Sequence, residues 1–356
     1  MNPHLRNIYV CKEKKIYSFG KSALYTVCNV DLPPCYEDPD IVYVEKDPIF
    51  YLNISITNNC NLSCKHCLSN TTSRGNPFQE FTKEQIIDFV YRLQCQGLSN
   101  ISITGGEPFL CKNIFTWLDE LQKYNIDTKI NTNGTLLDEK TVDLLVEYDN
   151  LTEMDISING GENDSGIYYD KTNSIPTKIA NINYLLSRNK SIDVFMSSVL
   201  SKSVLYSLDD IEEAIAKTGV TTWKLKDIHI PYDKIERIPD DLIPSKGEVM
   251  SVLRSFLSKP HSVNVIGYLV ESINNGSKAS RCENHGQRGF YISHTGDVLW
   301  MHSFAIKLGN IYHDSIPMLA SRLTSAIEEN PIPVRCGKCS SRYACFKSPY
   351  DLKESS

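Results

Sequence analysis

Residues 51–67 read YLNISITNNCNLSCKHC, an alternating apolar run that leads directly into three closely spaced cysteines. Alternation of this kind predicts a β-strand over residues 51–57 with one buried face. Cys60, Cys64 and Cys67 follow this strand and place three thiols close enough together to bind one metal centre. Zinc would need a fourth ligand, which His66 is poorly placed to supply, whereas an iron–sulfur cluster can take three thiolates and keep one iron open. Three buried thiols without a metal are the remaining interpretation.

The strand at 51–57 is the first of six that alternate with helical patterns. Alternating strands and helices are typical of a parallel sheet covered by helices, and six such units can form most of a barrel. We therefore predict an α/β fold, a partial (β/α)6 TIM-like barrel whose ligands bind at the carboxyl ends of the strands. Cap signals are expected at Thr82 with Gln85, Ser207 with Asp210 and Ser245 with Glu248. The later strands are expected near 101–104, 127–131, 152–158, 192–200 and 222–228, and the helices near 82–97, 113–124, 138–148, 175–188, 207–218 and 245–258.

The chain divides into three parts by its patterns. Residues 1–49 hold short β-like runs and form a small N-terminal β-rich extension, and residues 50–260 form the barrel. Residues 261–356 are richer in Gly, His and Cys and form a C-terminal module, with a hairpin predicted over 290–300.

Composition bounds the class of protein. The chain has 356 residues, 12 cysteines and a net charge of −6, without the basic excess of a nucleic-acid binder. No apolar run approaches the roughly 20 residues of a membrane helix, and the first residues lack the core of a signal peptide. We therefore expect a cytoplasmic protein in which clustered cysteines bind metal, with no nucleic-acid or membrane partner.

Four motifs at the ends of successive strands resemble the radical S-adenosylmethionine (SAM) superfamily over roughly residues 50–230. They are the C-x3-C-x2-C group, Gly105-Gly106-Glu107-Pro108, Thr132-Asn133-Gly134 and Ser157-Ile-Asn-Gly160. The resemblance implies that Cys60, Cys64 and Cys67 hold a [4Fe–4S] cluster whose open iron binds SAM.

The resemblance also implies a set of cofactor contacts. Gly105, Gly106 and Glu107 would hold the amino group of SAM, and His66 stands where the family places an aromatic residue against the adenine. Asn133 belongs to the same site, and Ser157 and Asn159 are candidates for the ribose or carboxylate. Asn159 replaces the commoner Asp. No catalytic residue is predicted.

The second cysteine group resembles the SPASM/twitch domains that carry auxiliary clusters. Cys282, Cys336, Cys339 and Cys345 match part of that pattern, and they imply one auxiliary iron–sulfur cluster, expected to be [4Fe–4S]. Met301 stands at a position where the pattern has a cysteine ligand. The alternatives to a cluster with four cysteine ligands are therefore a cluster in which His302 replaces one thiolate, a cluster with one open iron, and a zinc site on the four cysteines.

The resemblance implies reductive cleavage of SAM to a 5'-deoxyadenosyl radical that abstracts a hydrogen atom from substrate. Auxiliary-cluster members often modify ribosomally made peptides, which favours a peptide substrate. The alternative is a small-molecule dehydrogenase or epimerase in sugar or aminoglycoside-type biosynthesis, and a non-enzymatic metal scaffold would leave Glu107 unexplained. A flavodoxin- or ferredoxin-type electron donor is the expected partner.

Overall fold

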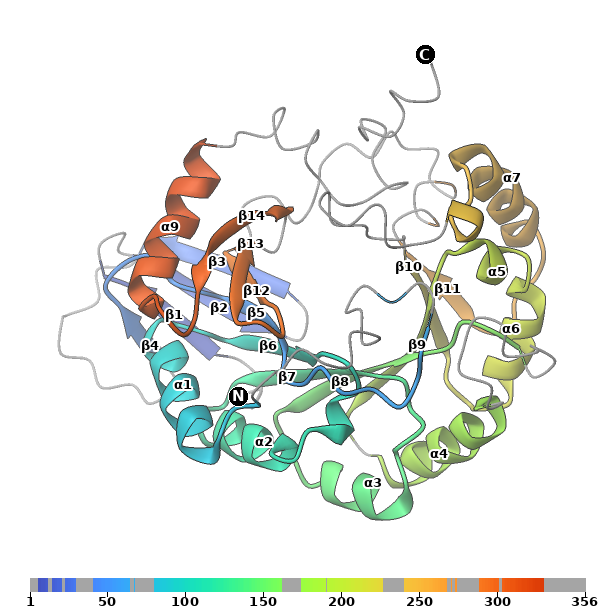
Figure 1. Cartoon of the computed structure of the whole chain (residues 1–356), viewed down its shortest axis with the longest axis horizontal. Coiled ribbons are helices and arrows are strands. Elements are labelled where there is room, and N and C mark those ends of the chain that lie inside the picture. Colours follow the sequence, from blue (N-terminus) through green and yellow to red (C-terminus); the bar gives the residue numbers. More distant parts are fainter. Residues whose placement is uncertain are drawn as a thin grey trace.

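The computed structural model describes residues 6–11, 15–20, 23–29, 41–64, 67, 80–161, 174–189, 191–226, 240–267, 270, 273, 288–300 and 303–329. A ten-stranded sheet in the order β11-β10-β9-β8-β7-β6-β5-β12-β13-β14 forms its centre. Strands β5 to β11 pair in parallel and curve into an arc with the helices on the outer side (Figure 1), which confirms the predicted α/β partial barrel. These strands are β5 (Tyr51–Ser55), β6 (Asn100–Thr104), β7 (Asp127–Thr132), β8 (Leu151–Ser157), β9 (Asp193–Val199), β10 (Thr222–Lys226) and β11 (Asn264–Ile266).

The helices begin close to the predicted signals. Thr82 and Gln85 form the expected capping box of α1, and Ser245 and Glu248 form that of α7. Ser207 is the N-cap of α6, as expected, although its side chain makes no capping hydrogen bond. The helices are α1 (Lys83–Cys95), α2 (Ile114–Lys123), α3 (Glu139–Leu145), α4 (Ile175–Arg188), the unpredicted α5 (Lys202–Leu205), α6 (Leu208–Ala216) and α7 (Lys246–Leu257).

The hydrophobic core lies between the sheet and this outer layer of helices. The apolar faces of α1 and α2 are fully buried, as at Val90 and Trp117, and they cover alternate residues of the strands such as Ile103 and Ile130. Each such side chain contributes about 1.5–3 kcal/mol through burial. The side chains on the other face of each strand point toward the inside of the arc.

The N-terminal extension forms its own four-stranded sheet in the order β3-β2-β1-β4. Strand β2 (Lys15–Gly20) was not predicted and joins β1 and β3 in antiparallel pairs. The other strands are β1 (Arg6–Val10), β3 (Ala23–Asn29) and β4 (Ile41–Val44).

The strands of the C-terminal module continue the barrel sheet. The predicted hairpin is present as β12 (Gly289–Ile292) and β13 (Asp297–Trp300), followed by β14 (Ser303–Asn310) and helix α9 (Ile316–Glu329). Strand β12 pairs in parallel with β5, so this hairpin extends the barrel beside its first strand. Cys282, Cys336, Cys339, Cys345, Met301 and His302 lie outside the described residues. No helix in the described part of the chain is long and apolar enough to cross a membrane.

Candidate functional site

The three cysteines of the first group lie on the loop that leaves β5. Cys60, Cys64 and Cys67 are half-buried and free, and the amide of Cys67 donates to the carbonyl of Cys64 at 3.1 Å. Burial raises the pKa of Cys60, and burial together with the charge of Cys67 raises that of Cys64 to about 12. In their ionised form the three thiols therefore repel one another, and a cationic metal centre would relieve this repulsion. His66 lies outside the described residues.

The two glycines after β6 pack against the backbone that leads to Cys60. The amide of Gly106 donates to the carbonyl of Thr57 at 2.8 Å, and the amide of Glu107 donates to that of Asn59 at 2.7 Å. A Cβ atom on Gly105 would lie 2.4 Å from the Thr57 carbonyl oxygen, and one on Gly106 would lie 2.1 Å from that of Asn59. The glycines thus permit a close approach between two loops of the chain itself.

The carboxylate of Glu107 is fully buried and joins this loop to the end of β7. Its Oε1 accepts from the Thr132 hydroxyl at 2.7 Å and from the Phe109 amide at 3.3 Å, while Oε2 accepts from the Asn133 amide at 2.8 Å. Burial nevertheless raises the pKa of Glu107. A carboxylate has about four acceptor positions, so three bonds leave capacity for one more donor.

Asn133 connects the end of β7 with the cysteine loop. Its Nδ2 donates to Asn61 Oδ1 at 2.9 Å and lies 4.0 Å from Cys60 Sγ, and its Oδ1 accepts from the Thr135 amide at 2.9 Å. The predicted site residues Cys60, Glu107 and Asn133 are therefore brought together at the carboxyl ends of β5, β6 and β7.

Lys178 of α4 is a site residue that the sequence analysis missed. Lys178 is 2% exposed, and its ammonium group donates to the Ser157 carbonyl at 3.1 Å. Burial lowers its pKa to about 8, and the charges of Cys64, Glu107 and Cys60 oppose that shift. A signal was present, because Lys178 occupies the buried face of α4 between Ile175 and Ile182, where a helix normally carries an apolar residue.

Asn159 and Ser157 mark the end of β8. The Oδ1 of the buried Asn159 accepts from the Val199 amide at 2.8 Å, so this oxygen joins β8 to β9. Ser157 lies at the same edge through its contact with Lys178. The C-terminal hairpin adds Tyr291, whose pKa is raised to about 12 by burial and by the charge of Cys67.

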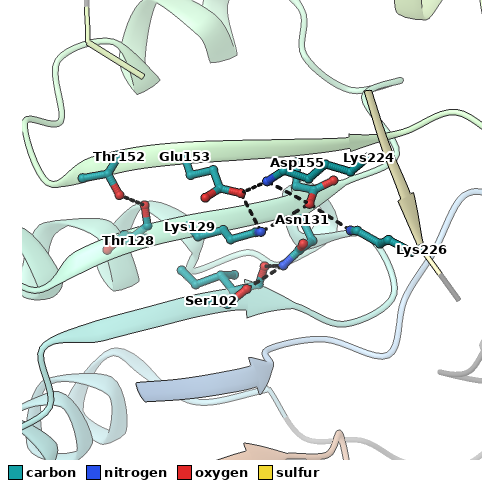
Figure 2. Close-up of polar contacts among 10 residues, drawn as sticks. Ser102, Thr128, Lys129, Asn131, Thr152, Glu153, Asp155, Lys224 and Lys226 are labelled. Atoms are coloured by element: carbon teal, nitrogen blue, oxygen red, sulfur yellow. Dashed lines mark hydrogen bonds and ion pairs between the residues drawn. The ribbon is translucent and has the colours of Figure 1, made fainter. Parts of the chain in front are cut away.

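The inner face of the arc carries charged side chains that the sequence analysis also missed. Figure 2 shows Lys129 on β7, Glu153 and Asp155 on β8 and Lys224 and Lys226 on β10 pointing toward one another. We call these five residues the luminal ion network.

The donor set fits an iron–sulfur cluster. Iron–sulfur clusters are held by cysteine thiolates, and Cys60, Cys64 and Cys67 bring three free thiols to one loop. Beside the thiols stand a buried acceptor, Glu107, and a buried cation, Lys178. This pairing suits a ligand that bears both an ammonium and a carboxylate group.

A sequence profile described as the Radical SAM superfamily matches residues 54–218, which include the three cysteines. Among curated proteins, the GTP 3',8-cyclase of Helicobacter pylori is 28% identical over 172 residues, or 46% of this chain. That match spans only half of the relative's own length.

Solved structures show the same fold at low sequence identity. The structure of native anSMEcpe with bound AdoMet is similar with a TM-score of 0.61 and 17% identity, over 84% of this chain and 92% of that one. Streptococcus suis SuiB bound to precursor peptide SuiA is similar with a TM-score of 0.60 and 15% identity, over 87% and 74% of the two chains.

Proposed function

We propose, from the match of residues 54–218 to the Radical SAM superfamily, that Cys60, Cys64 and Cys67 hold a [4Fe–4S] cluster that binds SAM. The observation that carries the proposal is the convergence of these thiols with Glu107 and Lys178. When bound, the cluster supplies the electron that cleaves SAM to methionine and a 5'-deoxyadenosyl radical.

The chain's own residues would orient the cofactor. The free acceptor capacity of Glu107 suits the amino group of SAM, and the ammonium of Lys178 suits its carboxylate. Gly105 and Gly106 hold the loop of Cys60 in place, and Asn133 bridges that loop to β7. Ser157 lies beside Lys178 and is assigned to the ribose or carboxylate, whereas Oδ1 of Asn159 is already bonded to β9.

A peptide is the proposed substrate, and hydrogen-atom abstraction from it is the proposed reaction. Support comes from the fold shared with SuiB, whose structure holds a precursor peptide. The likeness to a GTP 3',8-cyclase favours the alternative, a small-molecule substrate. Cys282, Cys336, Cys339 and Cys345 are proposed to hold one auxiliary cluster.

The cofactor site is tested by measuring 5'-deoxyadenosine from SAM and dithionite after anaerobic reconstitution. Cys64→Ala should abolish the product, and Cys95→Ala, which removes an exposed thiol on α1, should leave it unchanged. Continued cleavage of SAM by Cys64→Ala would show that the cluster lies elsewhere.

The substrate class is tested by deuterium transfer into 5'-deoxyadenosine. Deuterated peptides encoded by short reading frames beside the gene should give labelled product, and deuterated GTP should not. Label from GTP alone would replace the peptide assignment with the small-molecule one.

A further inference from the structure

The inside of this barrel is charged where parallel barrels are usually apolar. The interior of a closed barrel is normally packed with branched apolar side chains. Here Thr128, Ile130 and Met154 face the helices and are fully buried, so the intervening residues of β7 and β8 face inward. Those residues include Lys129 and Glu153, the first members of the luminal ion network.

The network is held by short contacts between strands. Lys129 Nζ lies 2.6 Å from Glu153 Oε1 and 3.2 Å from Asp155 Oδ2. From β10, Lys224 Nζ lies 2.6 Å from the same oxygen of Glu153, and Lys226 Nζ lies 2.8 Å from Asp155 Oδ2 (Figure 2). Two carboxylates thus serve three ammonium groups, so among the described residues the network carries one positive charge in excess.

Two of the three ammonium groups, those of Lys224 and Lys226, lie on β10. Burial and the nearby ammonium of Lys129 lower the pKa of Lys224, whereas the carboxylates raise that of Lys129. Lys224 also stands 3.4 Å above the ring of Phe195, a contact that favours its cationic form. Lys226 has the most exposed side chain of the five, at 38%, and it ends β10 at the carboxyl edge of the sheet.

The network adjoins the proposed cofactor site along the same strands. Asp155 precedes Ser157 by two residues on β8, and Lys129 precedes Asn133 by four on β7, or about 7 and 13 Å at 3.3 Å per residue. The neighbouring inward groups on β5 to β9 are uncharged, namely Tyr51, Ser102, Asn131, Phe195 and Ser197. Asp127 and Asp193 begin β7 and β9, at the opposite end of the strands.

A purely structural role explains this arrangement poorly. Buried ion pairs lose solvation and are often no more stabilising than apolar residues of similar volume. An ammonium group that no carboxylate of the described residues balances adds to that cost, unless an anion completes the network when it binds.

We propose that Lys224 and Lys226 form the anion-binding part of the substrate site, and that the substrate inserts an oxyanion, a carboxylate or a phosphate, into the barrel lumen beside the cofactor. That this anion belongs to a substrate rests on the proposed function, whereas anion binding at the two lysines can be measured without turnover. The two carboxylates of the network position the lysines and limit the excess charge to one.

Succinate and inorganic phosphate are the probes. Their binding to the reconstituted, SAM-loaded chain is followed by saturation-transfer NMR for succinate and by 31P line width for phosphate. Lys226→Gln should weaken binding about tenfold, and Lys226→Arg, which keeps the charge, should restore most of it. Glu153→Gln should tighten binding severalfold, because it raises the excess charge. Lys259→Gln, on the outer surface with Asp209, should change nothing.

Comparison of Lys226→Gln with Glu153→Gln separates an effect on anion binding from an effect on folding. A structural network predicts that Lys226→Gln and Glu153→Gln both weaken binding, and that result, like equal binding in all variants or none in the wild type, overturns the proposal. If only succinate saturates the site, the substrate's oxyanion is assigned as a carboxylate; if only phosphate does, it is assigned as a phosphate. Formation of 5'-deoxyadenosine by wild type and Lys259→Gln is measured on the same samples, and its absence counts against the proposed function and not against the anion site.

Discussion

Replacing Gly106 with alanine tests whether the glycines after β6 hold the cysteine loop in place. The added Cβ would lie 2.1 Å from the carbonyl oxygen of Asn59 and 2.5 Å from its carbonyl carbon. An ordinary contact begins at 3.4 Å, so the two backbones must separate by at least 1.3 Å. Gly106 does not adopt a positive φ, so this effect is steric and not one of backbone conformation.

The cost can be worked out from the contacts that the separation breaks. Overpacking of this kind costs about 1–3 kcal/mol, and the bonds from the Gly106 and Glu107 amides contribute about 1 kcal/mol each. A loss of about 3–5 kcal/mol is expected. Because Asn59 adjoins Cys60, the same movement displaces a proposed cluster ligand.

Iron content, thermal midpoint and 5'-deoxyadenosine formation report on the two effects. Gly106→Ala should lower the midpoint by about 4–7 °C and reduce SAM cleavage at least tenfold. Gly247→Ala in α7 is the matched control, because the nearest atom to its new Cβ is 4.0 Å away and alanine favours a helix by up to about 1 kcal/mol. A Gly106→Ala protein with wild-type iron, midpoint and activity would refute the reasoning.

Three further predictions follow from other parts of the site. Lys178→Gln should raise the KM for SAM about tenfold or more, while Lys178→Arg restores it in part; an unchanged KM would exclude contact with the cofactor carboxylate. Cys339→Ala should lower the iron content from about eight to about four per chain, and retention of all eight would disprove the auxiliary ligand set. Asp155→Asn should lower the thermal midpoint at neutral pH, because Lys226 and Lys129 outweigh the effect of burial and hold the pKa of Asp155 well below its usual range. This stabilisation should persist as the pH falls to about 4, the unfolded pKa, and be lost below it, so a gap in midpoints that closes near neutral pH would contradict the assignment.

The barrel could be predicted because its signals are local. Strand β7 was expected at 127–131 and spans Asp127–Thr132, and α4 has the predicted bounds. Capping boxes act within four residues, so sequence alone locates them. Helix α5 escaped prediction because its four residues are too few to show a 3.6-residue period.

The candidate site was predictable where parallel strands end together. Glu107 and Asn133 were expected at the same edge because each follows a strand of one parallel sheet, and the structure places the Glu107 carboxylate 2.8 Å from the Asn133 amide. The spacing of the motifs could not predict the hydrogen-bond partner of the Glu107 carboxylate. This partner lies at the end of β7, in a loop 26 residues away in the sequence. Lys178 depended on the same kind of long-range packing, since only the docking of α4 brings it to Ser157.

The luminal ion network shows why substrate specificity is harder to predict than the cofactor site. Lys129, Glu153 and Lys224 are each followed by an apolar residue on their strands, and such alternation also describes a sheet with one solvent-exposed face. Only the curvature of the sheet, set by packing over the whole arc, turns that face inward and brings Lys224 to Glu153 across 71 residues of sequence. Once inward, the same charges lose solvent and must find partners, so their balance constrains what can bind beside them. Cofactor motifs can therefore be predicted from one strand at a time, whereas the charge inside the barrel depends on how all the strands of the arc are arranged.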